Sequence, residues 1–101
     1  MNMQALLKQA QKMQKDLAKV EAELSEKEYE ATMGGGVVKV SVKDMKVETI
    51  EIDETLLEKD GKEDLQDMLK AALNEALTLA VEDKEKTMNA ITGGVKMPGG
   101  F

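Results

Sequence analysis

The sequence predicts an α+β fold in which a long N-terminal helix precedes a three-stranded antiparallel sheet and a long C-terminal helix follows it. Three observations indicate this order. Apolar residues repeat in heptads over residues 3–24, alternate with polar residues between residues 29 and 52, and form a wide helical stripe over residues 65–80. With 101 residues the chain has the length of one domain, which we assign to residues 1–101.

The first predicted helix covers about residues 3–27. Its apolar side chains are spaced alternately three and four residues apart, as at positions a and d of a heptad: Met3, Leu6, Ala10, Met13, Leu17, Val20 and Leu24. We call these seven residues the seam. Asn2 is the expected N-cap, because an Asn side chain accepts a hydrogen bond from the first turn. Periodicity leaves open whether the seam packs within one protomer or across a dimer.

Three short strands are predicted after this helix. Residues 29–33 and 38–42 alternate apolar with polar side chains, and Gly34–Gly36 is expected to form the turn between them. In the third strand the apolar phase slips between Val47 and Ile50, which predicts a β-bulge or a change of face.

A second long helix is predicted to begin after Asp60. Glu63 follows Asp60 by three residues, which resembles a capping box with Asp in place of Ser or Thr. The helix then carries a wide apolar stripe suited to packing on a sheet: Leu65, Met68, Leu69, Ala72, Leu73, Ala76, Leu77 and Ala80. Gly93 and Gly94 are expected to end it, and residues 95–101 are predicted to be a flexible tail.

The composition excludes most enzyme chemistry. Cysteine and histidine are both absent, so there is no thiol, no disulfide, and neither the commonest metal ligand nor the commonest general base. We therefore predict no enzyme activity, no cofactor, no metal and no small-molecule substrate. No apolar run approaches the roughly 20 residues that span a bilayer, so we expect no membrane partner and a cytoplasmic location.

Positive charge is concentrated at the beginning of an acidic chain. The net charge is −6, yet residues 1–20 carry four lysines and one aspartate, a side-chain charge of +3, which leaves −9 for the remainder. The four lysines fall at heptad positions f and c, opposite the seam: Lys8, Lys12, Lys15 and Lys19. We call them the lysine ridge. Such a ridge suits contact with DNA phosphates, although an ordinary solvated helix face has the same spacing.

The residue types that are missing restrict how nucleic acid can be recognised. The chain contains no arginine, the residue that most often reads guanine in the major groove, so binding should have little sequence specificity. Aromatic residues make up only 2% of the chain, which removes the stacking surface used by single-strand binders. Contact with the backbone of duplex DNA is the mode that remains.

Along its whole length the sequence resembles the YbaB/EbfC family. The resemblance lies in Met3–Met13, Gly34–Gly36 with Val38 and Val40, Ile50–Asp53 with Leu56 and Leu57, Ala71–Leu77, Thr92–Gly94 and Met97–Gly99. It implies a nucleoid-associated homodimer whose sheets join at the centre and whose paired helices project like tweezers that grip double-stranded DNA. It also implies a role in nucleoid organisation and, for some members, in transcription.

By its position, the lysine ridge falls on the projecting helix that similar proteins use for DNA contact. Lys84 and Lys86, near the end of the second helix, are further candidates for DNA binding. The alternative prediction is a prefoldin-like or coiled-coil protein-interaction module without DNA binding. The acidic overall charge favours this alternative, whereas the short first helix opposes it.

Overall fold

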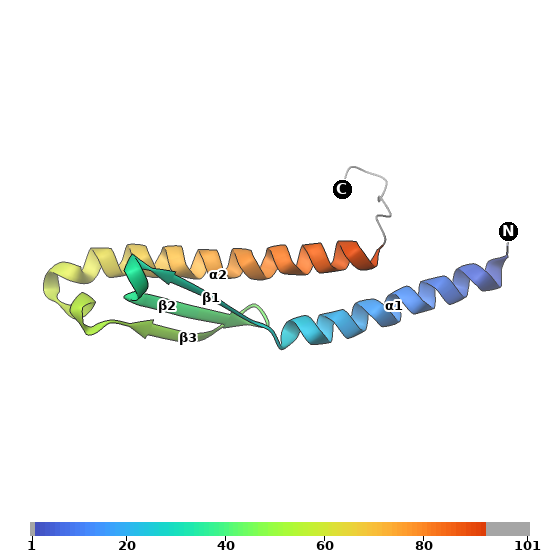
Figure 1. Cartoon of the computed structure of the whole chain (residues 1–101), viewed down its shortest axis with the longest axis horizontal. Coiled ribbons are helices and arrows are strands. Elements are labelled where there is room, and N and C mark those ends of the chain that lie inside the picture. The colour runs from blue at the N-terminus through green and yellow to red at the C-terminus, as the bar shows by residue number, and fades with distance from the viewer. Residues whose placement is uncertain (1, 93–101) are drawn as a thin grey trace.

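In the computed structural model, which describes residues 2–92, one long helix covers a face of a three-stranded sheet and another extends away from the end of that sheet (Figure 1). In chain order the elements are α1 (Met3–Ser25), β1 (Glu28–Met33), β2 (Val38–Lys43), β3 (Lys46–Ile52) and α2 (Lys62–Ile91). The strands form an antiparallel sheet in the order β1-β2-β3. This arrangement confirms the predicted fold class. The predicted tail and the glycines expected to end the second helix lie outside the described residues.

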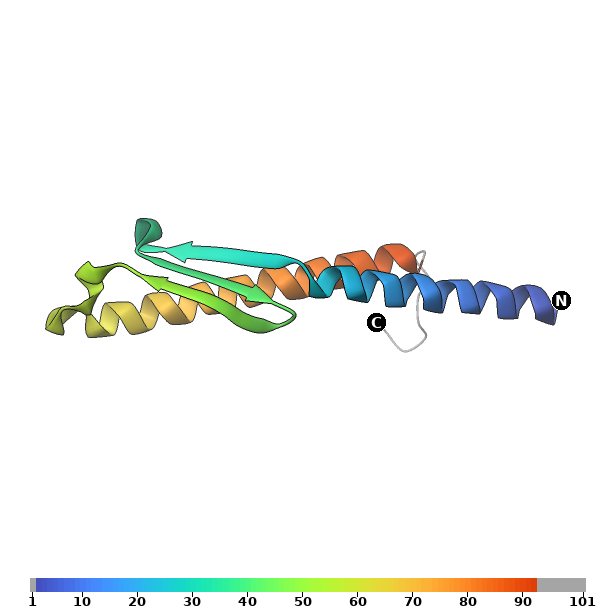
Figure 2. The same ribbon diagram turned by 90° about the horizontal axis from the view of Figure 1, so that it is seen from below.

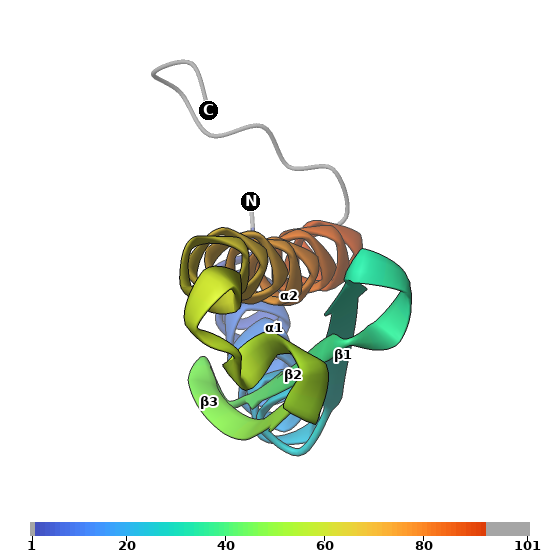
Figure 3. The same ribbon diagram turned by 90° about the vertical axis from the view of Figure 1, so that its left-hand side faces the viewer.

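The core lies between α2 and one face of the sheet (Figure 3). The side chains of Val38, Val40 and Val42 on the central strand are fully buried. Alanines spaced four residues apart on α2 are buried against the sheet: Ala72, Ala76 and Ala80. Small side chains let the helix backbone approach the central strand closely, while the leucines of the predicted stripe pack around this contact. The stripe on α2 is therefore confirmed as the sheet-packing face.

A β-bulge explains the phase slip in β3. Ser41 pairs with Thr49, whereas the next residue of β2, Val42, pairs with Val47, so Glu48 is the extra residue. The predicted bulge is confirmed. Because of it, Val47 and Ile50 stand opposite the buried Val42 and Val40 of β2 and share their face of the sheet, but they lie beside the core and are 49% and 46% exposed.

Both hairpin turns contain backbone with positive φ. Gly34–Gly36 joins β1 to β2 as predicted, with φ values of 62°, 73° and 101°. Between β2 and β3, the two-residue turn of Asp44 and Met45 has φ values of 53° and 60°. Positive φ at both central positions is the geometry of a type I′ hairpin turn, in which a methionine is an unfavourable occupant.

The two helices begin differently. Asn2 caps α1 as predicted, since its Oδ1 accepts a hydrogen bond from the backbone N–H of Gln4 at 3.0 Å. The capping box predicted at Asp60 is wrong. Gly61 is the N-cap residue of α2 and makes no side-chain cap bond. Asp60 lies instead in a 3₁₀ turn, Lys59–Gly61, that runs directly into the helix and so lacks the extended backbone of a capping residue.

The seam packs within the protomer along only part of α1. Met13, Leu17, Val20 and Leu24 are half-buried where α1 lies beside the end of α2, whereas Met3 and Leu6 are 69% and 45% exposed. The N-terminal part of α1 projects beyond the end of α2, as Figures 1 and 2 show from two sides. We call α1 the arm because of this projection.

Candidate nucleic-acid interface

The lysine ridge lies on the outside of the arm. All four of its residues are exposed, and none of them forms an ion pair within residues 2–92. Since an α-helix rises about 1.5 Å per residue, the ridge is roughly 16 Å long. The structure thus places these four predicted residues on one exposed helix face, with their ammonium groups available to an anionic partner.

The two ends of the lysine ridge have different surroundings. Lys19 borders a shallow cavity of about 390 Å³ between α1 and the end of α2, together with the carboxylates of Asp16 and Glu23. Lys8 and Lys12 lie on the part of the arm that carries no acidic residue before Asp16. The electrostatic potential should therefore be most positive towards the projecting end.

The lysines of the sheet are in a different electrostatic environment. Lys39 lies 3.2 Å from Glu30, and Lys43 lies 3.5 Å from Glu26. The carboxylates of Glu30, Glu51 and Glu28 raise the pKa of Lys39, mainly through its hydrogen bond to Glu30. These pairs reduce the positive charge that Lys39 and Lys43 present to an anionic partner.

The two candidates on α2 do not join the lysine ridge. Lys84 lines a cavity of about 470 Å³ between the end of the arm, the β2–β3 turn and α2, and the carboxylates of Glu21 and Asp44 line the same cavity. Lys86 is exposed on α2. A lysine that shares a cavity with two carboxylates is a poorer phosphate ligand than an isolated one, so Lys84, like Lys19, is a weaker candidate than Lys8 and Lys12.

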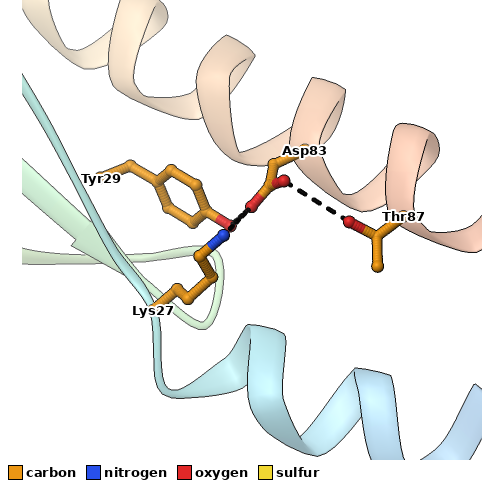
Figure 4. Close-up of polar contacts among 4 residues, drawn as sticks. All are labelled: Lys27, Tyr29, Asp83 and Thr87. Carbon is orange, nitrogen blue, oxygen red and sulfur yellow. Dashed lines mark hydrogen bonds and ion pairs between the residues drawn. The ribbon is translucent and has the colours of Figure 1, made fainter.

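Sequence reasoning missed a polar cluster at the base of the arm (Figure 4). Asp83 on α2 accepts hydrogen bonds from Lys27 Nζ at 2.7 Å and from the Tyr29 hydroxyl at 2.5 Å, and Thr87 Oγ1 lies 3.5 Å from its other oxygen. The hydrogen bonds from Lys27 and Tyr29 lower the pKa of Asp83. Burial, followed by the contact with Asp83, raises the pKa of Tyr29 to about 12.

The described residues contain neither a membrane-spanning helix nor a metal-binding cluster. Neither of the two long helices between residues 2 and 92 contains an apolar stretch sufficient to cross a bilayer. The same part of the chain contains no cluster of three or more acidic side chains arranged to hold a metal ion.

Comparison with known proteins identifies the family. The model of the YbaB/EbfC DNA-binding family matches residues 1–95. The chain belongs to this family. YbaB/EbfC relatives include a nucleoid-associated protein from Alkaliphilus metalliredigens, 46% identical over 101 residues, with 99% of this chain and 89% of the relative covered. A nucleoid-associated protein from Clostridium novyi is 45% identical over 102 residues, with 100% and 90% covered.

The fold also matches a solved structure. The crystal structure of an uncharacterized protein from Helicobacter pylori superposes with a TM-score of 0.79 at 26% sequence identity, and the match covers 92% of this chain and 99% of that one. This match confirms the fold, while the family model and the two nucleoid-associated relatives confirm the resemblance to the YbaB/EbfC family seen in the sequence. The family is described as DNA-binding, so DNA is the class of ligand expected at the lysine ridge.

Proposed function

We propose that the protein binds double-stranded DNA with little sequence preference, and that it does so as a homodimer in the nucleoid through the lysine ridge of each arm. The observation that carries the proposal is the exposure of four lysines on one helix face, without ion pairs among residues 2–92, in a chain of net charge −6. The names of the nucleoid-associated relatives support the location.

Phosphate contact is the binding mode that these side chains favour. Each lysine that neutralises a phosphate releases condensed counterions, and this gain does not depend on base sequence. Lysine is a compact point charge that lacks the planar fork with which arginine reads guanine. The acidic remainder of the protein opposes contact with DNA and so orients the molecule with its arms towards the duplex.

The exposed side of β3 supports the homodimer. β3 is an edge strand, and three apolar side chains on or beside it are about half exposed: Met45 at 49%, Val47 at 49% and Ile50 at 46%. An unpaired strand edge with exposed apolar residues tends to associate with another chain. A second copy that covers this edge would bring two lysine ridges into one particle and double the number of phosphate contacts.

The test is a fluorescence-anisotropy titration of a random-sequence duplex at several salt concentrations. If a dimer makes about four to eight phosphate contacts, log K should fall against log salt with a slope of roughly −4 to −7. The variant with Lys12→Glu and Lys15→Glu should bind all duplexes more weakly by a similar factor, because the lost contacts are to the backbone. Affinity that did not change with salt would contradict the proposal.

A matched control separates the position of the charge from its amount. Lys62→Glu with Lys70→Glu makes the same change in net charge at exposed positions on α2, away from the lysine ridge. We expect this control to bind DNA much more tightly than the ridge variant. Light scattering and circular dichroism on all three proteins would establish that their assembly and helix content are equal.

One observation favours the alternative of a protein-interaction module. Met3, Leu6 and Leu7 are 69%, 45% and 58% exposed at the projecting end of the arm, which gives that end apolar surface. The arm is only 23 residues long, however, which limits the grip of a coiled-coil clamp. Failure of the folded wild type to bind duplex at low salt, together with suppression of aggregation of an unfolded client, would favour this alternative.

A further inference from the structure

The arm is attached to the rest of the protein by few contacts. Only Glu26 and Lys27 separate α1 from β1, and no residue of α1 is buried. The half-buried part of the seam contacts α2, and a cavity of about 470 Å³ remains between the base of the arm, α2 and the β2–β3 turn. Packing of this kind holds a helix less firmly than burial in a core does.

Polar side-chain contacts between α2 and the rest of the described chain all converge on one residue. Within residues 2–92, the side-chain hydrogen bonds and ion pairs that join α2 to another segment are those of Asp83 with Lys27 and with Tyr29. Lys27 belongs to the two-residue link between the arm and the sheet, and Tyr29 is the second residue of β1. We call Lys27, Tyr29 and Asp83 the arm clamp.

The geometry of the arm clamp suits a rigid attachment. Both donors reach the same carboxylate oxygen, Asp83 Oδ2, and Lys27 Nζ also lies 5.9 Å from the centre of the Tyr29 ring. Thr87, one turn further along α2, contacts the other carboxylate oxygen. Hydrogen bonds to an ionised group are stronger than neutral ones, and this set ties three segments of the chain together at one point.

We propose that the arm clamp is a positioning device that fixes the direction of α1 relative to α2, and thereby the place of the lysine ridge. Its effect on DNA affinity rests on the function proposed above. The length of the arm makes its base important: 23 residues span about 34 Å, so a rotation of 10° at the base moves the tip by about 6 Å. That displacement exceeds the spacing of about 3.4 Å per phosphate along one DNA strand.

Pre-organisation is the physical reason why positioning should change affinity. An arm held in one direction loses little conformational freedom when DNA binds, whereas a loose arm has to be ordered by the binding event. Breaking the arm clamp should therefore weaken binding while the number of phosphate contacts, and with it the salt slope, stays the same. A lysine variant would instead reduce both the affinity and the slope.

Two conservative variants test the proposal. Tyr29→Phe removes the hydroxyl and keeps the packed ring, and Asp83→Asn removes the charge and keeps the shape. Glu30→Gln is the control, since it breaks the pair with Lys39 on the sheet and leaves the arm clamp intact. Circular dichroism and thermal unfolding would show that each variant keeps its helices.

The position of the arm is measured directly by pulsed electron spin resonance. The chain has no cysteine, so spin labels at Gln9→Cys on α1 and Glu75→Cys on α2, both exposed positions, are unique. Mixing labelled protein with an excess of unlabelled protein leaves only distances within one chain. We expect one narrow distance distribution in the wild type and in the control, and a clearly broader or shifted one in both arm-clamp variants.

Duplex titrations of the same proteins complete the test. For the arm-clamp variants we expect a loss of affinity of about three- to tenfold with an unchanged salt slope. Unchanged distance distributions in both variants would overturn the proposal, and so would altered distributions with wild-type affinity. If the wild type bound no duplex, the proposed function would fail, while the distance measurement would still decide whether the arm clamp holds α1.

Discussion

Replacement of Gly34 by alanine should destabilise the fold by about 2–3 kcal/mol. Gly34 has φ +62°, a conformation that costs a residue with a Cβ atom about 1 kcal/mol. An added Cβ would also lie 2.7 Å from Met68 Sδ and 2.7 Å from Val37 Cγ2, at the point where the turn meets α2. Moving these two side chains away from the added Cβ should cost about a further 1–2 kcal/mol.

Gly35 provides the matched control for this prediction. Its φ is +73°, but an added Cβ would meet no atom within 4 Å, so Gly35→Ala should cost only about 1 kcal/mol. The assay is urea unfolding followed by far-ultraviolet circular dichroism, at equal protein concentration because assembly affects apparent stability. Equal losses of unfolding free energy in the two variants would show that the contact with Met68 and Val37 has no energetic weight.

Three further predictions concern the arm clamp and the core. Tyr29 is the only tyrosine and there is no tryptophan, so its titration can be followed by tyrosinate absorbance; the midpoint should lie near pH 12 in the wild type and lower in Asp83→Asn. Because the folded pKa of Tyr29 lies above its unfolded value of 10.0, the stability that the protonated Tyr29 hydroxyl contributes is fully present below pH 10 and is lost as the pH rises through about 12. In Tyr29→Phe, the unfolding free energy should not show this decrease between pH 10 and 12. The lowered pKa of Asp83 acts in the opposite direction: its stabilisation is present above the unfolded value of 3.8 and is lost as the pH falls through the folded pKa. In urea unfolding, the wild type should therefore exceed Asp83→Asn in unfolding free energy at neutral pH, and this difference should shrink as the solution is acidified. Ala76→Leu should destabilise the fold by about 1–3 kcal/mol in chemical unfolding, since Ala76 is fully buried against the sheet and a larger side chain would separate α2 from the central strand; an unchanged midpoint would contradict this packing.

The parts of the fold that local sequence determines were predictable. Asn2 caps α1 through a residue two positions away, and the glycines of the first turn satisfy a local requirement for positive φ. The bulge at Glu48 was visible because it shifts the apolar phase of a single strand. The capping box predicted at Asp60 was wrong, because the spacing of Asp60 and Glu63 gives no sign that Asp60 lies in a 3₁₀ turn that runs directly into the helix.

The candidate interface was predictable only in part. The lysine ridge follows from helical spacing, so its alignment on one face of α1 needed no tertiary information. The surroundings of Lys84 depend on how α1, the β2–β3 turn and α2 come together, and no pattern in the chain indicates that Glu21 and Asp44 line the same cavity. The arm clamp was also hidden, because Tyr29 and Asp83 are 54 residues apart in the sequence.

The contact between the base of the arm and α2 has a consequence for synthesis of the chain. Lys27 leaves the ribosome 56 residues before its partner Asp83, which at about 5–20 residues per second is a delay of roughly 3–11 s. During that time the sheet lacks the helix that covers it, and the half-buried seam lacks its support. The nascent chain therefore exposes the apolar face of the sheet and the seam until α2 has been synthesised, and we expect the core to form only then.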